Sequence, residues 1–218
     1  GGAMASFTGY GVGQFTNSFF IRSHHLSILN ASLISGVLVG IFGGGGTFLA
    51  GWMSDKVVKR HPNALAWFPG LTLLVSIPLS IGGYLAQNLV LAIPLLALAT
   101  LFQYPYVSAI YAATQGVVHP RMRATAVAVL LFIVNIIGLG AGPPAIGALS
   151  DFLAGHHLAA AGLSVAACKA GPLAASAPCA EGAAFGLKWA IVIGYFGFAW
   201  AAAHFFLAWR TMPKDRHA

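Results

Sequence analysis

The chain has 218 residues, of which eleven are Lys or Arg and four are Asp or Glu, while 58% are hydrophobic. A water-soluble domain carries charge over its whole surface, so this composition excludes one and indicates an integral membrane protein. The strict alternation of polar and apolar residues that marks membrane β-strands is absent, which leaves an all-α fold.

Charge-poor stretches follow one another along the chain and predict a polytopic membrane bundle of six helices. The clearest is 61–120, which holds no charged residue and has basic residues on both sides. A helix of about 20 residues crosses the hydrocarbon core, so this stretch predicts two spans that return to the side they left. The predicted spans are about 1–21, 27–53, 64–86, 89–118, 123–154 and 187–211, with a loop at 155–186.

The first predicted span carries three candidate substrate contacts. Gln14 and Asn17 are three positions apart and share a helix face, and Arg22 follows at the outer end. Polar groups at membrane depth usually face the bundle or a water-filled cavity. The alternatives are satisfied interhelix hydrogen bonds and, for Arg22, an arginine that reaches the lipid interface. Because Gly1 starts directly inside an apolar run without an initiating Met, we expect an upstream part of the protein.

Glycines at four-residue spacing mark the second and fifth spans. Gly36, Gly40 and Gly44 share one face of the second span, and Gly138 and Gly142 repeat the pattern in the fifth. Such faces let two helices approach backbone to backbone in lipid. Static close packing and a moving interface are both compatible with this pattern.

The fourth and fifth spans carry further polar side chains. The additional candidate substrate contacts are Gln103, Tyr104, Tyr111, Gln115 and Asn135. The four acidic residues, Asp55, Asp151, Glu181 and Asp215, all lie at span ends or in loops, so a buried carboxylate for proton coupling is expected outside this segment.

The loop at 155–186 contains both cysteines, Cys168 and Cys179. A disulfide there would contribute roughly 3 kcal/mol by restricting the unfolded chain, and two unpaired thiols are the alternative. No His or acidic residue stands at ligand spacing from both cysteines, so we expect no metal site.

The basic residues are unequally divided between the two sides of the predicted bundle. Those on the side of the C-terminus are Lys56, Lys59, Arg60, Arg121, Arg123, Arg210, Lys214 and Arg216. The other side holds Arg22, Lys169 and Lys188. This bias predicts that the C-terminus lies in the cytoplasm and 155–186 outside, and we expect the membrane to be the inner membrane of a bacterium. It accounts for the positive charge without a nucleic-acid partner.

The segment Gly51-Trp-Met-Ser-Asp55-Lys56-Val-Val-Lys59-Arg60 resembles the G-x-x-x-D-(R/K)-x-x-(R/K)-(R/K) loop signature of the Major Facilitator Superfamily. Within that superfamily, similarity to the spinster-type branch lies in Phe-Ile-Arg-Ser-His at 20–24, Pro-Arg-Met-Arg-Ala-Thr at 120–125, Asn-Ile-Ile-Gly-Leu-Gly-Ala-Gly-Pro at 135–143 and Gly-Ala-Leu-Ser-Asp at 147–151. The resemblance covers nearly the whole chain. It implies the C-terminal half, helices 7–12, of a twelve-helix transporter whose N-terminal six-helix half is a partner.

The resemblance also implies roles for the parts of this half. The first and fourth spans would line the central path, the second and fifth would meet the other half, and the third and sixth would face lipid. The gating loop would comprise Gly51, Asp55, Lys56, Lys59 and Arg60, with Arg123 as a partner for Asp55. A carboxylate there can accept hydrogen bonds from amides at a helix N-terminus.

The function implied by the resemblance is secondary active transport by alternating access of two rocking halves. The expected cargo is a lysophospholipid or a sphingoid-phosphate-like anion, exported in exchange for protons. Another small solute (a sugar phosphate, an organic anion or a drug) is one alternative, and a homodimeric six-helix scaffold or receptor is another. We find no nucleophile–base pair or phosphate loop, so we expect neither an enzyme nor a cofactor; membrane lipid and the small-molecule substrate are the remaining partners.

Overall fold

The structure, a computed structural model, describes residues 1–60, 64–169 and 176–215; the side chains of residues 54–60, 65–66 and 211–215 lie outside this description. Within these ranges the chain forms helices joined by short turns, with no strand, which confirms the predicted all-α fold. The helices, in chain order, are α1 (Gly2–Gly13), α2 (Thr16–His24), α3 (Ile28–Val37), η1 (Leu38–Gly43), α4 (Gly44–Arg60), α5 (Ala64–Leu85), α6 (Leu89–Gln103), α7 (Pro105–Gly116), η2 (Pro120–Met122), α8 (Arg123–Asn135), η3 (Ile136–Ala141), α9 (Gly142–Ala159), α10 (Val165–Lys169), α11 (Ala177–Gly194) and α12 (Gly197–Asp215).

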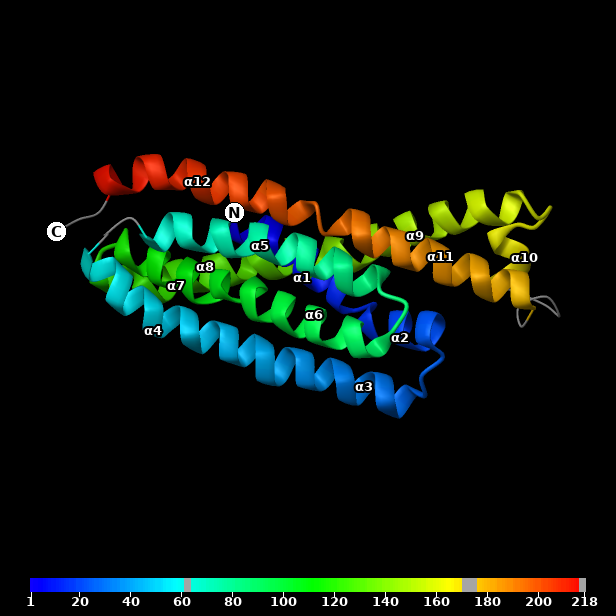
Figure 1. Cartoon of the computed structure of the whole chain (residues 1–218). Coiled ribbons are helices and arrows are strands. Elements are labelled where there is room, and N and C mark those ends of the chain that lie inside the picture. Colours follow the sequence, from blue (N-terminus) through cyan, green and yellow to red (C-terminus); the bar gives the residue numbers. More distant parts are fainter. Residues whose placement is uncertain (61–63, 170–175, 216–218) are drawn as a thin grey trace.

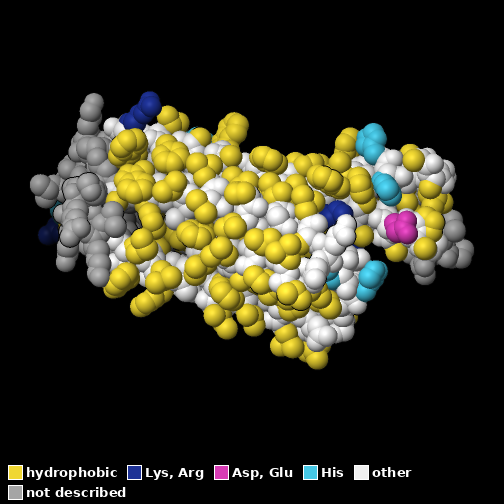
Figure 2. Space-filling view, in the orientation of Figure 1, with side chains coloured by type: hydrophobic (Ala, Val, Ile, Leu, Met, Phe, Trp, Pro, Cys, Tyr) yellow, Lys and Arg dark blue, Asp and Glu magenta, His cyan; other side chains and the backbone are white. Residues whose placement is uncertain are grey.

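The helices lie along one long axis (Figure 1). The α2–α3 turn, the α5–α6 turn and α10 lie at one end, which we call the α10 end; α4 and α12 finish at the opposite end, the C-terminal end. Hydrophobic side chains cover the middle of the visible face, and the charged and histidine side chains gather toward its two ends (Figure 2). This is the distribution expected of helices whose middle parts lie in hydrocarbon.

Five helical stretches of the described chain are long and apolar enough to cross a membrane. They are Ile28–Met53, Trp67–Leu85, Leu89–Gly116, Pro120–Ala159 and Ala177–Arg210. The predicted first span is instead divided into α1 and α2, because the backbone tightens where the amide of Phe15 donates to the carbonyl of Val12 at 2.9 Å. Neither piece is long enough to cross alone.

The segment 155–186, which we expected to be a loop, is largely helical where the structure describes it. α9 continues to Ala159, α10 occupies Val165–Lys169, and α11 begins at Ala177. Ser176 is the extended N-cap of α11, and Pro178 lies in its first turn, where a missing amide hydrogen removes no helical bond. The alanines of this segment favour a helix. We expected a loop because the segment also contains serines, glycines and prolines.

Small residues bring the helices of the bundle close together. A Cβ added to Gly142 would lie 2.6 Å from the carbonyl oxygen of Phe7, so α9 packs directly on the α1 backbone. A Cβ added to Gly138 would likewise collide with Ser6 and Tyr10 of α1. The glycine face predicted in the fifth span therefore packs inside this bundle.

The glycines of the second span divide into two faces. A Cβ on Gly46 would collide with the carbonyl oxygen of Leu101, so this face packs against α6. Gly36, Gly40 and Gly44 have no atom of the described chain within 4 Å of an added Cβ. The repeated glycine stripe is thus left open by this bundle.

Candidate functional site

A small polar pocket lies beside the break between α1 and α2, and we call it the inner pocket. Its volume is about 70 Å³. It is lined by Gly9, Gly13, Thr16, Ser35, Leu38, Val39, Tyr84, Leu96, Thr100, Gln103, Tyr104 and Tyr195. None of these side chains is charged, so the pocket offers hydrogen bonds and aromatic surface but no ionic contact.

Tyr84 of α5 and Tyr195, which directly follows α11, form one wall of the inner pocket. The hydroxyl of Tyr84 lies 3.0 Å from Oγ1 of Thr16, at the start of α2. The Tyr84 ring packs edge-on against Phe19, with centroids 4.7 Å apart, and its centroid lies 5.6 Å from that of Tyr195. Edge-on packing of this kind fixes ring orientation, so the polar ends of the two tyrosines are held at the pocket.

The opposite wall is set by the break between α6 and α7. Pro105 starts α7 and cannot donate a backbone hydrogen bond, so α6 ends with Gln103 and leaves Tyr104 at the junction. Gln103 is only 9% exposed, and the Tyr104 ring lies 3.1 Å from where a Cβ on Gly43 would stand. A glycine at position 43 therefore leaves the space that the Tyr104 ring occupies.

One hydroxyl in the inner pocket has no internal partner in the described structure. Oγ of Ser35 is buried without a hydrogen bond, whereas Oγ1 of Thr100 donates to the Leu96 carbonyl at 2.7 Å. A water molecule occupies about 30 Å³, so this half of the site has room for a water or one polar group of a ligand. The inner pocket is therefore a small polar hollow, too small to hold a larger molecule by itself.

Two larger hollows lie at the α10 end and share Arg22, His25 and Ala180; we call them together the α10 pocket. Their volumes are about 460 Å³ and 390 Å³. The first is also bordered by Asp151 and Lys169, and the second by residues of α11. This pocket is separate from the inner pocket, with which it shares no lining residue.

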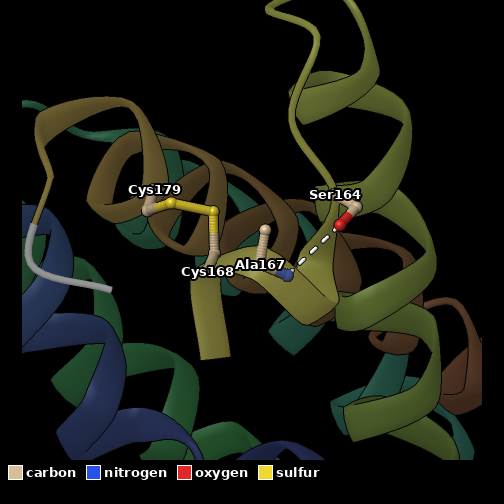
Figure 3. The surroundings of a disulfide bond; sticks show 4 residues. All are labelled: Ser164, Ala167, Cys168 and Cys179. Atoms are coloured by element: carbon tan, nitrogen blue, oxygen red, sulfur yellow. Dashed lines mark hydrogen bonds between the residues drawn. A yellow bond between two sulfur atoms is a disulfide. The ribbon is translucent and has the colours of Figure 1, made fainter. Parts of the chain in front are cut away.

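A covalent bond and an ion pair hold the wall of the α10 pocket. The structure joins Cys168 of α10 to Cys179 of α11 by a disulfide, with Cα atoms 5.4 Å apart (Figure 3). Nζ of Lys169 lies 2.5 Å from a carboxylate oxygen of Asp151 on α9. Ser164 caps α10, since its hydroxyl accepts a hydrogen bond from the Ala167 amide at 3.2 Å. The alternative of two unpaired thiols is therefore not what the structure shows.

The predicted substrate contacts are only partly brought together. Gln103 and Tyr104 line the inner pocket, and Arg22 lines the α10 pocket. Tyr111 packs half-buried against the core, and Asn135 donates to the Leu131 carbonyl of its own helix at 2.8 Å. Three more are exposed and line neither pocket: Gln14, Asn17 and Gln115.

The predicted gating residues lie at the C-terminal end. A Cβ on Gly51 would meet no atom of the described chain within 4 Å, and Arg123 is the exposed first residue of α8. The side chains of Asp55, Lys56, Lys59 and Arg60 lie outside the described part of the structure. The pairing of Asp55 with Arg123 stays a prediction.

Two acidic residues that we expected at span ends or in loops lie on helices. Asp151 is on α9, and Glu181 is in the first turns of α11. α9 ends beyond the predicted end of the fifth span and α11 begins before the predicted start of the sixth, and both acids border the α10 pocket. The α10 end therefore has more helical structure than a connecting loop would have.

Five polar residues of the inner pocket were missed from the sequence: Thr16, Ser35, Tyr84, Thr100 and Tyr195. The third span was expected to face lipid, but Thr72, Ser76, Ser80 and Tyr84 are buried on α5. These four are each four positions apart and share one face, which is the signal that could have identified this side of α5 as internal.

Comparisons with known proteins agree with this architecture. No protein-family model matches the chain. It is 31% identical over 153 residues to an MFS-type efflux pump of Mycolicibacterium smegmatis, a match that covers 70% of this chain and 35% of that protein. Two crystal structures of a bacterial homologue of the human lysosomal transporter Spinster, both inward-facing and one of them occupied, match all of this chain with TM-scores of 0.87 and 34% identity.

The chain has the fold of half a Major Facilitator Superfamily transporter. It spans 47% and 49% of the two Spinster homologue chains, so it corresponds to about half of their length. The predicted superfamily and the predicted half-fold are confirmed. Its homologues are transporters, and the chain is a multi-pass membrane protein.

Proposed function

We propose that this chain is the C-terminal half of a secondary active transporter that exports an amphipathic anion by alternating access. The observation that carries the proposal is the match of the whole chain to half of an inward-facing Spinster homologue, at a TM-score of 0.87. The relative from Mycolicibacterium smegmatis is an efflux pump, which supports outward movement of the cargo. Lysophospholipids and sphingoid phosphates are the cargo class that we propose.

The other half of the transporter is the proposed partner for the open glycine stripe. Gly36, Gly40 and Gly44 lack any close neighbour in the described chain, and large apolar side chains beside them, Val37 and Ile41, are exposed. A glycine face of this kind is suited to close contact with a second helix in lipid. Since the chain spans about half of the Spinster homologue, a second bundle is available in a protein of that length.

We infer that the C-terminal end faces the cytoplasm of a bacterial cell and that the α10 end faces outward. Exposed Arg121, Arg123 and Arg210 belong to the C-terminal end, as the bias of basic residues toward the cytoplasm requires. The disulfide supports the outward placement of the α10 end, because disulfides persist in oxidising compartments. The first and fourth spans would then contribute the inner pocket to a path between the two sides.

The proposal is tested by uptake into proteoliposomes that contain the full-length protein. Labelled lysophospholipid and labelled hexose phosphate are compared, each with and without an imposed proton gradient. We expect the lysophospholipid to accumulate only with the gradient and the hexose phosphate not to move. Movement of hexose phosphate alone would instead assign the cargo to another branch of the superfamily, and movement of neither would contradict the proposal.

A second cargo class has its own support. The relative from Mycolicibacterium smegmatis is called an efflux pump without reference to lipid, so we propose efflux of an uncharged or cationic drug-like solute as the runner-up. The uncharged lining of the inner pocket is compatible with such a cargo. Accumulation of ethidium, but not of lysophospholipid, would favour it.

A further inference from the structure

The α10 pocket has the size of a ligand site. Its two hollows of about 460 Å³ and 390 Å³ meet at Arg22 and His25, which border both. Sites for small molecules usually occupy about 300–1,000 Å³. Each hollow is therefore large enough for a headgroup and part of a chain, and the inner pocket of about 70 Å³ is not.

The charges around the α10 pocket leave an arginine available to a ligand. Asp151 is already paired with Lys169. Arg22 is exposed and makes no ion pair with any residue that the structure describes. Lys188 and Glu181 border the second hollow, so the uncompensated charge at the junction is positive. A guanidinium group binds phosphate or carboxylate through two parallel hydrogen bonds, and this favours an anionic headgroup at Arg22.

Apolar side chains also line the first hollow. Ile21 precedes Arg22 in the lining, and Leu158 of α9 and Val165 of α10 complete the wall with small alanines. Leu158 is 2% exposed, so it is fixed in the core and presents a rigid edge. A ligand that fills this hollow has a charged end at the junction and an apolar part against α9 and α10.

The shape of the wall depends on the disulfide. α10 has five residues, too few to be stable as an isolated helix. It is held to α11 by Cys168–Cys179 and to α9 by Lys169–Asp151, and all four of these residues border the first hollow. Loss of the disulfide would free α10 from α11 and open the side of the pocket that it forms.

We propose that the α10 pocket binds an amphipathic anion, with Arg22 as the contact for its phosphate or carboxylate group and the Cys168–Cys179 disulfide as the bond that keeps its wall in place. The inference rests on the proposed transport function in one respect, namely that the pocket borders the route of the cargo. The binding itself is a property of this chain's own residues.

The test measures equilibrium binding to the full-length protein in nanodiscs by isothermal titration calorimetry. The probes are dodecyl phosphate, inorganic phosphate and dodecanol. We expect dodecyl phosphate to bind with saturation, dodecanol to show no saturable binding, and inorganic phosphate to bind at least tenfold more weakly. Equal affinity for the two phosphates would contradict a role for the apolar wall, and saturable binding of dodecanol would contradict a role for the cation.

Arg22→Gln should weaken dodecyl phosphate binding at least tenfold, and Arg22→Lys should restore part of the loss. The matched control is Arg210→Gln, which removes an exposed arginine at the opposite end and should bind as the unmodified protein does. Unchanged affinity in Arg22→Gln, with the same helical content by circular dichroism, would overturn the assignment.

The disulfide is tested by Cys168→Ser with Cys179→Ser and, independently, by reduction of the unmodified protein. Both treatments should weaken dodecyl phosphate binding severalfold, and reduction should have no further effect on the double variant. Full affinity after reduction would show that the bond does not hold the pocket wall. Reduction requires no new chain to fold, so a poorly folding variant does not prevent this test.

Binding and transport give separate outcomes. Arg22-dependent binding in a protein that moves no lysophospholipid would leave the pocket in place and contradict the proposed function. If the protein transports lysophospholipid but Arg22→Gln leaves its affinity for dodecyl phosphate unchanged, the proposed function is supported and the proposed binding at Arg22 is contradicted.

Discussion

The Tyr84 hydroxyl joins the end of α5 to the start of α2 by a 3.0 Å contact with Oγ1 of Thr16. Both side chains border the inner pocket, so the contact fixes the geometry of that wall as well as the break in the first span. A hydrogen bond between two side chains in a membrane protein contributes about 1 kcal/mol on average.

Tyr84→Phe should therefore lower the unfolding temperature of the purified protein by a few degrees, because Thr16 loses its partner while the ring packing stays. Circular dichroism in detergent measures the change. Tyr111→Phe is the control: Tyr111 packs half-buried against the core, and its hydroxyl has no hydrogen bond to another helix among the residues that the structure describes. Equal unfolding temperatures for the two variants would contradict the structural role of the Tyr84–Thr16 contact.

Gly46→Ala should disturb the packing of α4 on α6, because the added Cβ would collide with the Leu101 carbonyl oxygen. Backbone cannot move aside as a flexible side chain can, and overpacking of this kind costs about 1–3 kcal/mol. Thermal unfolding in detergent tests this expectation. Gly140→Ala adds the same methyl group in open space and should change stability far less; a greater loss at position 140 would mean that the close approach at Gly46 is not tight.

Asp55→Asn should slow transport severalfold and leave expression and helical content unchanged. The carboxylate stands in the loop signature near the end of α4, and Arg123 begins α8 at the same end of the bundle. Removing its charge weakens any contact with Arg123 or a helix N-terminus. Initial rates of uptake into proteoliposomes give the measurement, with Asp215→Asn near the end of α12 as a control. A normal rate in Asp55→Asn would mean that the charge of Asp55 has no role in gating.

Reduction of Cys168–Cys179 should lower the free energy of unfolding by about 3 kcal/mol, since the bond closes a short loop of the unfolded chain. Chemical unfolding with and without a phosphine reductant measures the loss. The double serine variant should have the lower stability from the start and should not respond to the reductant. A response in that variant would place the effect elsewhere in the protein.

Stability should also depend on the protonation of His24, which lies beyond the predicted first span. Burial first, and then the neighbouring charge of His25, lower the pKa of His24 below its ordinary value of 6.5. Its Nε2 is buried without a hydrogen-bond partner, between the rings of Phe19 and Phe20. Below pH 6.5 the unfolded chain binds a proton that the folded chain resists, so stability falls as the pH falls through this value.

Unfolding temperatures measured between pH 8 and pH 5 test this dependence, and His24→Asn should flatten part of the decline. His119→Asn, at an exposed turn of the C-terminal end, serves as the control. If the two variants and the unmodified protein declined together, another group would carry the dependence.

The sequence predicted the fold well because long apolar stretches and their basic flanks are strong signals for membrane helices. It predicted the inner pocket in part: Gln103 and Tyr104 were identified as polar residues at membrane depth. Thr16 and Ser35 were missed, because hydroxyl side chains often satisfy themselves on their own helix and carry little information about which way they face. Tyr195 was missed because it lies at the break between α11 and α12, and no proline in the sequence marks that break.

The α10 pocket was the least predictable part of the molecule. Arg22 was recognised as a candidate anion contact, but His25, Lys169 and Lys188 join it only through tertiary packing. The segment that we expected to be a loop contains the short helix α10, whose position is set by a disulfide. The sequence alone does not show whether its two cysteines are bonded. Local sequence patterns could therefore identify Arg22 as a candidate contact but could not predict the α10 pocket around it.

The wide turn η1 interrupts the span that carries the open glycine stripe, and η3 interrupts the span that packs on α1. A π-turn holds one residue more than an α-turn, which offsets the following helix by about 100° around its axis. If η1 exchanged its hydrogen bonds for α-helical ones, α4 would rotate as a unit about its axis while α3 kept its position. In each of these two spans a π-turn midway along the length thus sets the rotation of the following helix about its axis.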